Sequence, residues 1–464
     1  AAVLFAGCGF GVSLLLQSEG MWGEFAALQL RWRWQPTHEE RMLAQRANRP
    51  GREGLLVAKD EVDAWLAAPE WPSFRGADRS GRQQGPQIST QWRNSPPQEI
   101  WKISVGPGWS SFAVAGNLLF TQEQRGPLEE TVCYDADSGR EIWSQAVEKR
   151  FYESMGGPGP RATPTISDGK LFSMGASGDL IRLDPKSGDV AWQVDLQEVS
   201  NRKPPTWGFS SSPLVVDGNV VVHAGGDEDR GVLAFDVETG DLRWSAAAGD
   251  HSYSSPQLST IAGVDMVLML TNQGLHAFDP STGEVRFTYD WPYQGYRVLQ
   301  PQAVDGDSLL LATGMGVGTR RIRVVGEDGS FSTEDIWESR QLKPDFNDFV
   351  IHGDHTYGFD GGVFTCIDLK NGMRAWKGGR YGKGQVLLLE DSALLFVAGE
   401  QGEIVLLKAD PGERQELARF QALEGKTWNH PVVVGDRLYV RNAQEAACYQ
   451  LPLEGEAVAV NQRR

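Results

Sequence analysis

A phrase of fixed spacing recurs along the chain and constrains its fold more than any other feature. In Asp236-Val-Glu-Thr-Gly240-Asp-Leu-Arg-Trp244, three residues separate the aspartate from the glycine, and three separate the glycine from the aromatic residue. The same spacing starts again at Asp135, Asp184, Asp279 and Asp368. An aspartate that bonds to the backbone ahead of it and a glycine free to take positive φ are typical of a tight turn between two strands. Five copies in one register therefore indicate a repeat protein built from β-strands.

The phrase recurs every 40–50 residues or so, which is the period of a propeller blade. Each copy follows a hairpin of two β-branched runs, as in Pro213-Leu-Val-Val-Asp217-Gly218-Asn-Val-Val-Val222, so a repeat holds four strands. The expected hairpins begin at Phe112, Pro164, Pro213, Pro256, Pro301, Phe349, Val386 and Pro431.

The last hairpin lacks a fourth strand, whereas the strand of Trp101 at the front of the chain lacks a hairpin. We therefore expect an all-β fold, an eight-bladed propeller of four-stranded antiparallel blades. The strand of Trp101 closes the ring and removes the open edges.

The chain before the propeller divides by composition. Residues 1–16 are apolar and uncharged, and they start at Ala, so they indicate a truncated transmembrane segment; a signal peptide and a buried helix are the alternatives. Residues 17–70 are expected to form a connector with one short helix over 38–47, which Thr37 and Glu40 would cap. Glu19 and Glu24 precede the first basic residue, as on a non-cytoplasmic flank. The propeller is expected over 71–455, followed by a tail over 456–464.

Composition excludes several classes of function. The formal charge of −17 and the lack of a basic stripe argue against nucleic-acid binding. The four cysteines form no Cys-x-x-Cys pair, and three of them occupy equivalent repeat positions, as small buried residues do. His352-Gly-Asp354-His355 falls at a hairpin turn, so no metal site is expected there.

The repeated phrase resembles the tryptophan-docking repeat of the pyrroloquinoline-quinone (PQQ) dehydrogenase-like propellers. That superfamily holds both quinoprotein alcohol dehydrogenases and a non-catalytic lipoprotein of outer-membrane assembly. The opening Trp71-Pro-Ser-Phe-Arg75-Gly, after Trp32-Arg-Trp34, resembles membrane-tethered members from planctomycetes. The resemblance implies that one aromatic residue per blade packs against the neighbouring blade: Trp101, Trp143, Trp192, Trp244, Phe287, Trp337 and Trp376.

The resemblance also implies that the innermost strand of each blade lines a central channel. The residues before the hairpins would then form a polar axial ring: Ser111, Thr163, Ser212, Ser255, Gln300, Asp348, Gln385 and His430. Less regular residues surround it: Trp109, Arg161, Trp207, Tyr253, Arg297, Asn347, Lys383, Trp428 and Asn429. A concave site with aromatic walls and a few polar groups predicts ligand binding. The alternative is that these residues only solvate the channel.

A PQQ dehydrogenase needs hard oxygen ligands for Ca²⁺, and in the alcohol-oxidising members it has a pair of adjacent cysteines. This chain has no such pair, and its axial ring has one carboxylate. We therefore expect a non-catalytic propeller on the periplasmic side, tethered to a membrane, monomeric and without cofactor, which acts as a binding or assembly scaffold for other envelope proteins. The alternatives are a quinoprotein oxidoreductase with PQQ and calcium, and a propeller that binds a small molecule or a glycan.

Overall fold

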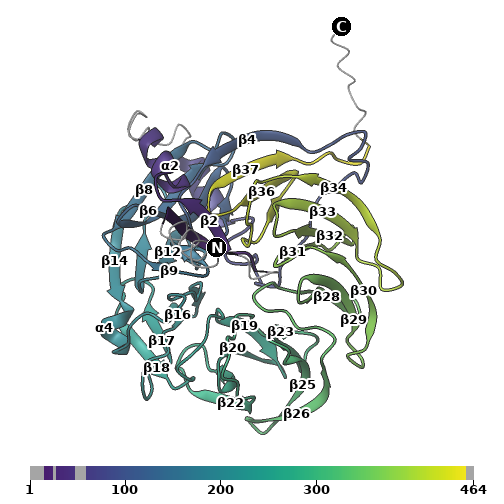
Figure 1. Ribbon diagram of the computed structural model, residues 1–464. Coiled ribbons are helices and arrows are strands. Elements are labelled where there is room, and N and C mark those ends of the chain that lie inside the picture. Colours follow the sequence, from purple (N-terminus) through teal and green to yellow (C-terminus); the bar gives the residue numbers. More distant parts are fainter. Residues whose placement is uncertain (1–14, 24–27, 47–58, 456–464) are drawn as a thin grey trace, which may run out of the picture.

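The computed structural model describes residues 15–23, 28–46 and 59–455. Eight blades stand around a central axis, and the chain runs round the ring in sequence order (Figure 1). The predicted all-β, eight-bladed propeller is confirmed.

Each blade has four antiparallel strands that follow one another from the axis outward, and the sheet of the seventh blade gains a fifth, parallel strand, β3 (Arg82–Gln83), at its inner edge. The first four blades are β5 to β8 (Ala113–Ala115, Leu118–Arg125, Leu128–Asp135, Glu141–Val147), β11 to β14 (Thr165–Ser167, Lys170–Met174, Asp179–Leu183, Val190–Asp195), β15 to β18 (Leu214–Val216, Asn219–His223, Val232–Asp236, Leu242–Ala246) and β19 to β22 (Gln257–Ile261, Val264–Leu270, Gly274–Phe278, Val285–Asp290).

The other four blades complete the ring. They are β23 to β26 (Gln302–Ala303, Ser308–Thr313, Gly318–Glu327, Ser330–Ser339), β27 to β30 (Val350–His352, His355–Asp360, Val363–Asp368, Arg374–Arg380), β31 to β34 (Gln385–Leu389, Leu394–Ala398, Glu403–Lys408, Glu416–Gln421) and β35 to β37 (Val432–Val434, Arg437–Arg441, Glu445–Gln450) joined by β4 (Gln98–Ser104). A small hairpin, β9 and β10 (Tyr152–Glu153, Gly157–Pro158), lies between the first and second blades in the chain, and a short helix, α4 (Leu196–Ser200), follows the second blade.

The ring closes where the sequence predicted. β4 pairs antiparallel with β37, and Trp101 lies opposite Cys448. The eighth blade therefore combines three strands from the C-terminal end of the propeller with one strand from its start.

The repeated phrase joins each blade to the next. In the turn after β17, the Asp236 carboxylate accepts from the backbone N–H groups of Glu238 and Thr239, and Gly240 takes φ 77°. The indole of Trp192, from the preceding blade, lies against Gly240, and its N–H donates to the carbonyl of Val237 at 3.1 Å. The indoles of Trp101, Trp143, Trp244, Trp337 and Trp376 donate to the equivalent turns of the following blades.

The region before the propeller holds more structure than the single short helix that we predicted. The hairpin β1–β2 (Leu16–Met21, Leu28–Trp32) comes first, then helix α2 (His38–Arg46), then helix α3 (Lys59–Ala67). At the start of α2, Thr37 and Glu40 bond reciprocally to each other's backbone N–H groups, as a capping box does.

Helix α3, within the predicted connector, packs on the core of the first blade. Its Val62 and Leu66 are buried against Ala115, Leu118 and other residues of the first blade. The apolar segment predicted over 1–16 lies outside the described residues except for Leu15 and Leu16, and Leu16 begins β1. In the described part of the chain, no helix is both long and apolar enough to cross a membrane.

Candidate functional site

A cavity of about 430 Å³ lies at one mouth of the axial channel. Its walls carry two groups of aromatic side chains. Trp207 packs against Tyr296, with ring centroids 4.0 Å apart, and against Tyr253, at 5.1 Å. In the other group, Trp428 packs against Trp109 at 4.7 Å and against Phe346 at 4.9 Å. These residues stand in the loops that lead into the innermost strands, which places their rings around the axis.

The channel below the cavity is filled by the chain itself. The segment from Trp71 to Gln83, here called the plug, exchanges two backbone hydrogen bonds with Val114 of β5 and ends as β3 (Arg82–Gln83), which pairs parallel with β31. The plug therefore crosses the axis from the first blade to the seventh. Phe74 of the plug forms part of the cavity wall and packs edge-on against the ring of His430.

Two buried arginines of the plug fix it to the ring. The guanidinium of Arg79 donates to the carbonyls of Ser212, Pro213 and Pro256, at the inner ends of two blades. That of Arg75 lies 3.0 Å from a carboxylate oxygen of Asp348. Burial without a carboxylate partner lowers the pKa of Arg79 to about 9.

Asp348 is held between a cation and a histidine. Its second carboxylate oxygen lies 2.9 Å from Nε2 of His430. Burial opposes its ionisation, but the charge of Arg75 and the hydrogen bond from His430 outweigh burial, so the pKa of Asp348 stays below its ordinary value. Burial also lowers the pKa of His430, which leaves a neutral imidazole that donates to the carboxylate.

The remaining charged side chains of the cavity are paired too. Lys383 binds Asp345, and Arg161 lies 3.3 Å from Glu153. Beside the cavity, the ammonium of Lys426 lies 4.3 Å from the ring centre of Trp428, and burial lowers its pKa to about 8.

The structure brings together part of the residue set predicted from the sequence. Asp348, His430 and Ser212 converge on the one axial cavity, together with Ser255, Gln385, Arg161, Trp207, Lys383, Trp428, Trp109 and Tyr253.

Six predicted residues do not line this cavity: Ser111, Thr163, Gln300, Arg297, Asn347 and Asn429. Arg297 is buried instead against the ring of Trp291, 4.0 Å from its centre. The amide of Asn429 donates to the carbonyls of Gly108 and Ser110.

Much of the polar ring has a structural role that the sequence analysis did not foresee. The backbone N–H of Ser111 donates to the Thr163 hydroxyl, that of Thr163 to the Ser212 hydroxyl, and that of Ser212 to the Ser255 hydroxyl, at 2.9–3.0 Å. On the other side of the ring, the N–H of Asp348 donates to the Gln385 amide oxygen. Each of these side chains satisfies the backbone of the preceding blade, which explains why hydroxyls and amides recur there.

Residues that the sequence analysis missed also line the cavity. Phe74, Tyr296 and Phe346 complete the aromatic walls, and Met155 and Met315 form an exposed apolar rim. Met21 and Trp22 reach the cavity from the turn end of the β1–β2 hairpin. Tyr296 and Phe346 could have been found, because they lie in the loops before the fifth and sixth hairpins; the plug has no counterpart in the repeat.

The donor set does not fit a calcium-bound quinone. All three carboxylates that line the cavity, Glu153, Asp345 and Asp348, already have a basic partner. Among residues 15–23, 28–46 and 59–455, no group of three His, Cys, Asp or Glu side chains could hold a metal ion.

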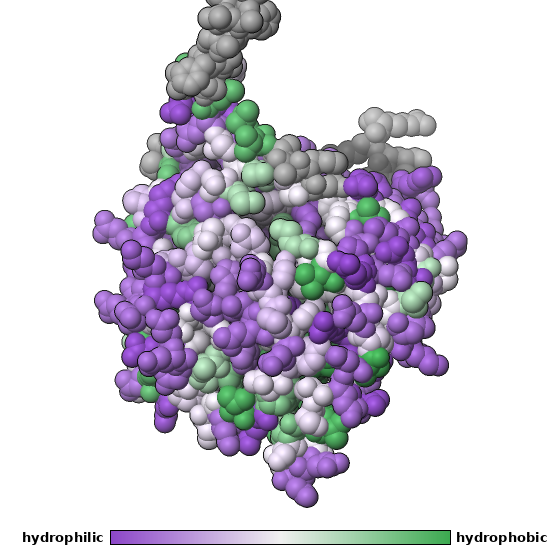
Figure 2. Space-filling view, turned by 60° about the horizontal axis from the view of Figure 1, so that its bottom comes forward, coloured by the Kyte–Doolittle hydropathy of each residue, from purple (hydrophilic) through white to green (hydrophobic). Residues whose placement is uncertain are grey.

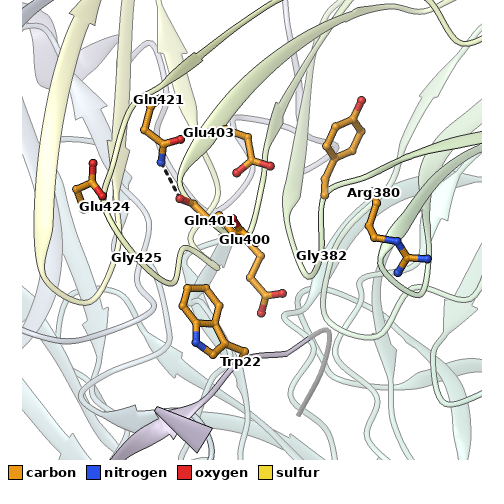
Figure 3. A pocket seen from close by; sticks show the side chains of 10 residues that line it. Trp22, Arg380, Gly382, Glu400, Gln401, Glu403, Gln421, Glu424 and Gly425 are labelled. Carbon is orange, nitrogen blue, oxygen red and sulfur yellow. Dashed lines mark hydrogen bonds between the residues drawn. The ribbon is translucent and has the colours of Figure 1, made fainter. Parts of the chain in front are cut away.

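A second cavity, of about 760 Å³, lies beside the first and shares Trp22 with it (Figure 3). It opens over the seventh blade and is lined by Glu400, Glu403, Glu424 and Arg380, among others. Burial raises the pKa of Glu403. Glu400 is engaged with its surroundings, since its carboxylate accepts from the indole N–H of Trp428 and the backbone N–H of Lys383.

Comparison with known proteins identifies the family of this propeller. The model of the family described as "Outer membrane protein assembly factor BamB" matches residues 89–203 and 157–378. The chain belongs to this family. Outer membrane protein assembly factor BamB of Burkholderia pseudomallei (strain K96243) is 26% identical over 364 residues, which cover 74% of this chain and 85% of that protein.

Quinoprotein dehydrogenases are also related, over a shorter stretch. Quinohemoprotein alcohol dehydrogenase ADH-IIG of Pseudomonas putida is 34% identical over 125 residues, which cover 26% of this chain and 17% of that enzyme. Among solved structures, BamB from Moraxella catarrhalis superposes with a TM-score of 0.56 at 16% identity, over 76% of this chain and all of that one. The P. putida enzyme gives 0.58 at 15% identity, over 86% of this chain and 83% of that one. Both structures share the propeller fold with this family member.

Proposed function

We propose that this BamB-family propeller is a non-catalytic scaffold of the cell envelope that binds other envelope proteins, in the manner that the name of its relatives suggests for outer-membrane protein assembly. One observation carries the proposal: the Asp348 carboxylate, the single acidic group of the axial ring, is bound by Arg75 and His430 of the same chain. A group committed in this way is neither a free base nor a metal ligand.

The mouth of the axial cavity is the proposed partner-binding face. Its rim exposes Met155 and Met315, which are 46% and 66% accessible, and aromatic walls lie directly behind them. Methionine adapts its shape to a partner, and buried aromatic residues are frequent energetic centres of interfaces. A protruding apolar side chain of a partner protein would fit this arrangement.

A crosslinking experiment tests the proposal. A photoreactive amino acid at Met315 should give a defined adduct with an envelope protein of the assembly machinery, whereas one at Val285, 47% accessible on the fourth strand of its blade, should not. Met155→Glu should abolish the adduct from Met315. Equal adducts from both positions, or none from Met315, would contradict the proposed face.

Titration with PQQ and Ca²⁺ separates the scaffold from a quinoprotein. We expect no protein-bound quinone absorbance and no quenching of tryptophan fluorescence, although Trp109, Trp207 and Trp428 all border the cavity. A saturable spectral change would favour the dehydrogenase reading instead.

The aromatic walls also favour a second candidate, the binding of a small apolar molecule or a glycan in the axial cavity. The volume of about 430 Å³ falls within the range of small-ligand pockets. Saturable quenching by a sugar or small-molecule panel, lost in Trp207→Ala, would support this candidate over a protein partner.

A further inference from the structure

The β1–β2 hairpin has two chemically different faces. Antiparallel pairing sets Leu16 opposite Trp32 and Ser18 opposite Leu30, so these residues share one face, together with Leu28. The other face carries Gln17, Glu19 and Arg31, and its charges are satisfied: the Arg31 guanidinium lies 2.8 Å from Glu19 and also donates to Gln17.

The apolar face is exposed to an unusual degree. Leu28 is 57% accessible and Leu30 54%, and the stacked indoles of Trp32 and Trp34, 4.9 Å apart, are also exposed. With Leu15, this short stretch supplies five of the fifteen exposed large hydrophobic residues in the described part of the chain. Figure 2 shows green, hydrophobic residues on the part of the molecule that projects upward from the propeller. Such a concentration marks an interaction surface.

We propose that this face inserts into the interfacial zone of a lipid bilayer. Residues 1–14, directly before the hairpin, contain no charged side chain, and the first charge of the whole chain is Glu19 on the polar face. The apolar run of the sequence thus continues into the apolar face of the ribbon. The paired indoles of Trp32 and Trp34 lie at the open end of the ribbon, where Trp32 is opposite Leu16. They match the preference of tryptophan for the boundary between acyl chains and headgroups.

A bilayer interface also suits the energetics of the ribbon. A two-stranded hairpin alone is marginally stable in water and needs a surface on which to bury its apolar side. The polar face, with its Glu19–Arg31 ion pair, would remain toward water, as in other interfacial amphipathic elements.

The inserted face would orient the propeller. The hairpin lies over the centre of the ring (Figure 1), where the backbone N–H of Met21 donates to the Met155 carbonyl and the Lys426 ammonium donates to the Met21 carbonyl. Because these contacts fix the hairpin to the rim of the axial cavity, the cavity would open toward the membrane.

Site-specific quenching tests this proposal. Single cysteines would be placed at Leu30, on the apolar face, and at Gln17, on the polar face of the same ribbon. Each would be labelled with an environment-sensitive fluorophore in the 464-residue chain carrying Cys8→Ser. Cys133, Cys366 and Cys448 are buried and should escape labelling in the folded protein. The protein would be mixed with phosphatidylcholine vesicles that contain spin-labelled lipid, with Leu242→Cys on β18 as the reference for an exposed leucine (49% accessible) remote from the hairpin.

We expect strong quenching and a blue shift at position 30, several-fold weaker quenching at position 17 and none at position 242. Equal quenching at 30 and 17 would show that the apolar face makes no insertion of its own and would overturn the proposal. So would a probe at position 30 that is already buried without vesicles, whether residues 1–14, a second copy or another protein covers the face. The readout does not depend on the partner-binding function proposed above.

Discussion

The guanidinium of Arg75 lies 3.0 Å from the carboxylate of Asp348, although the two residues are 273 positions apart in the sequence. The pair joins the plug to the sixth blade at the centre of the ring, and His430 of the eighth blade completes it. Plug and ring should therefore unfold together.

Removal of one partner of this pair should be costly. Arg75→Met leaves the buried Asp348 carboxylate without its cation and with only the hydrogen bond to His430, so we expect a loss of about 3–5 kcal/mol in the free energy of unfolding. The double variant Arg75→Met, Asp348→Leu should lose less than the sum of the two single variants, because it leaves no orphaned charge. Denaturant titrations of the four proteins measure this coupling; additive losses would show that the pair is not coupled.

Substitution of two glycines can separate the energy of the contact between blades from the cost of the backbone conformation. Gly240 and Gly263 both take φ 77°, but a Cβ on Gly240 would lie 2.8 Å from the Trp192 ring, whereas one on Gly263 meets nothing within 4 Å. Gly263→Ala should therefore cost only the backbone penalty of roughly 1–2 kcal/mol, and Gly240→Ala clearly more. Trp192→Ala should cost about 3–5 kcal/mol. Thermal melts of these variants test the register, which equal effects of the two glycine substitutions would contradict.

Truncations should separate the parts before the propeller. Deletion through Trp34 removes the hairpin and should leave the propeller folded. Deletion through Glu70 also removes Val62 and Leu66 from the core of the first blade, so a lower melting temperature is expected. Deletion through Ile103 removes most of β4 and opens the ring, so aggregation is expected. Light scattering and thermal melts should rank the three in this order.

Two buried histidines should make the protein sensitive to acid. Burial lowers the pKa of His223 to about 3 and that of His276 to about 4. Both lie below the unfolded value of about 6.5. The unfolded chain thus binds protons first, and stability falls as the pH drops below about 6.5. His276→Gln should flatten this decline by more than about 1.4 kcal/mol, the value of one pKa unit. Denaturant titrations between pH 7 and pH 4 measure it; an unchanged slope would argue against a buried, neutral His276.

The repeat made the propeller predictable in detail, because Asp236, Gly240 and Trp192 each have one structural task and recur with it. The same logic located the closing strand of Trp101. Among the elements outside the repeat, helix α2 was predicted from its capping box, but the β1–β2 hairpin and helix α3 were not. Leu28 to Trp32 alternate correctly for a strand, but nothing in the sequence sets their partner strand, and Lys59–Ala67 reads as a weakly amphipathic stretch until the first blade is placed beneath it.

The axial site was predictable only in outline. The equivalence of Ser212, Asp348 and His430 in the repeat placed them around one axis, but it could not show that Arg75 occupies that axis. A residue such as Thr163 combines a polar side chain with a variable position, which looks functional in a sequence. The structure shows that its hydroxyl serves the backbone of the neighbouring blade.

The pairing of β4 with β37 has a consequence for biosynthesis. The strand that completes the last blade leaves the ribosome before β5 to β34 of the other blades, and its partner strands β35 to β37 leave after them. β4 must therefore wait, with both edges unpaired, while more than 300 residues are made. During that interval the chain is exposed to edge-to-edge association and to proteases. A holdase that shields an extended strand would be most useful to this protein at Gln98–Ser104.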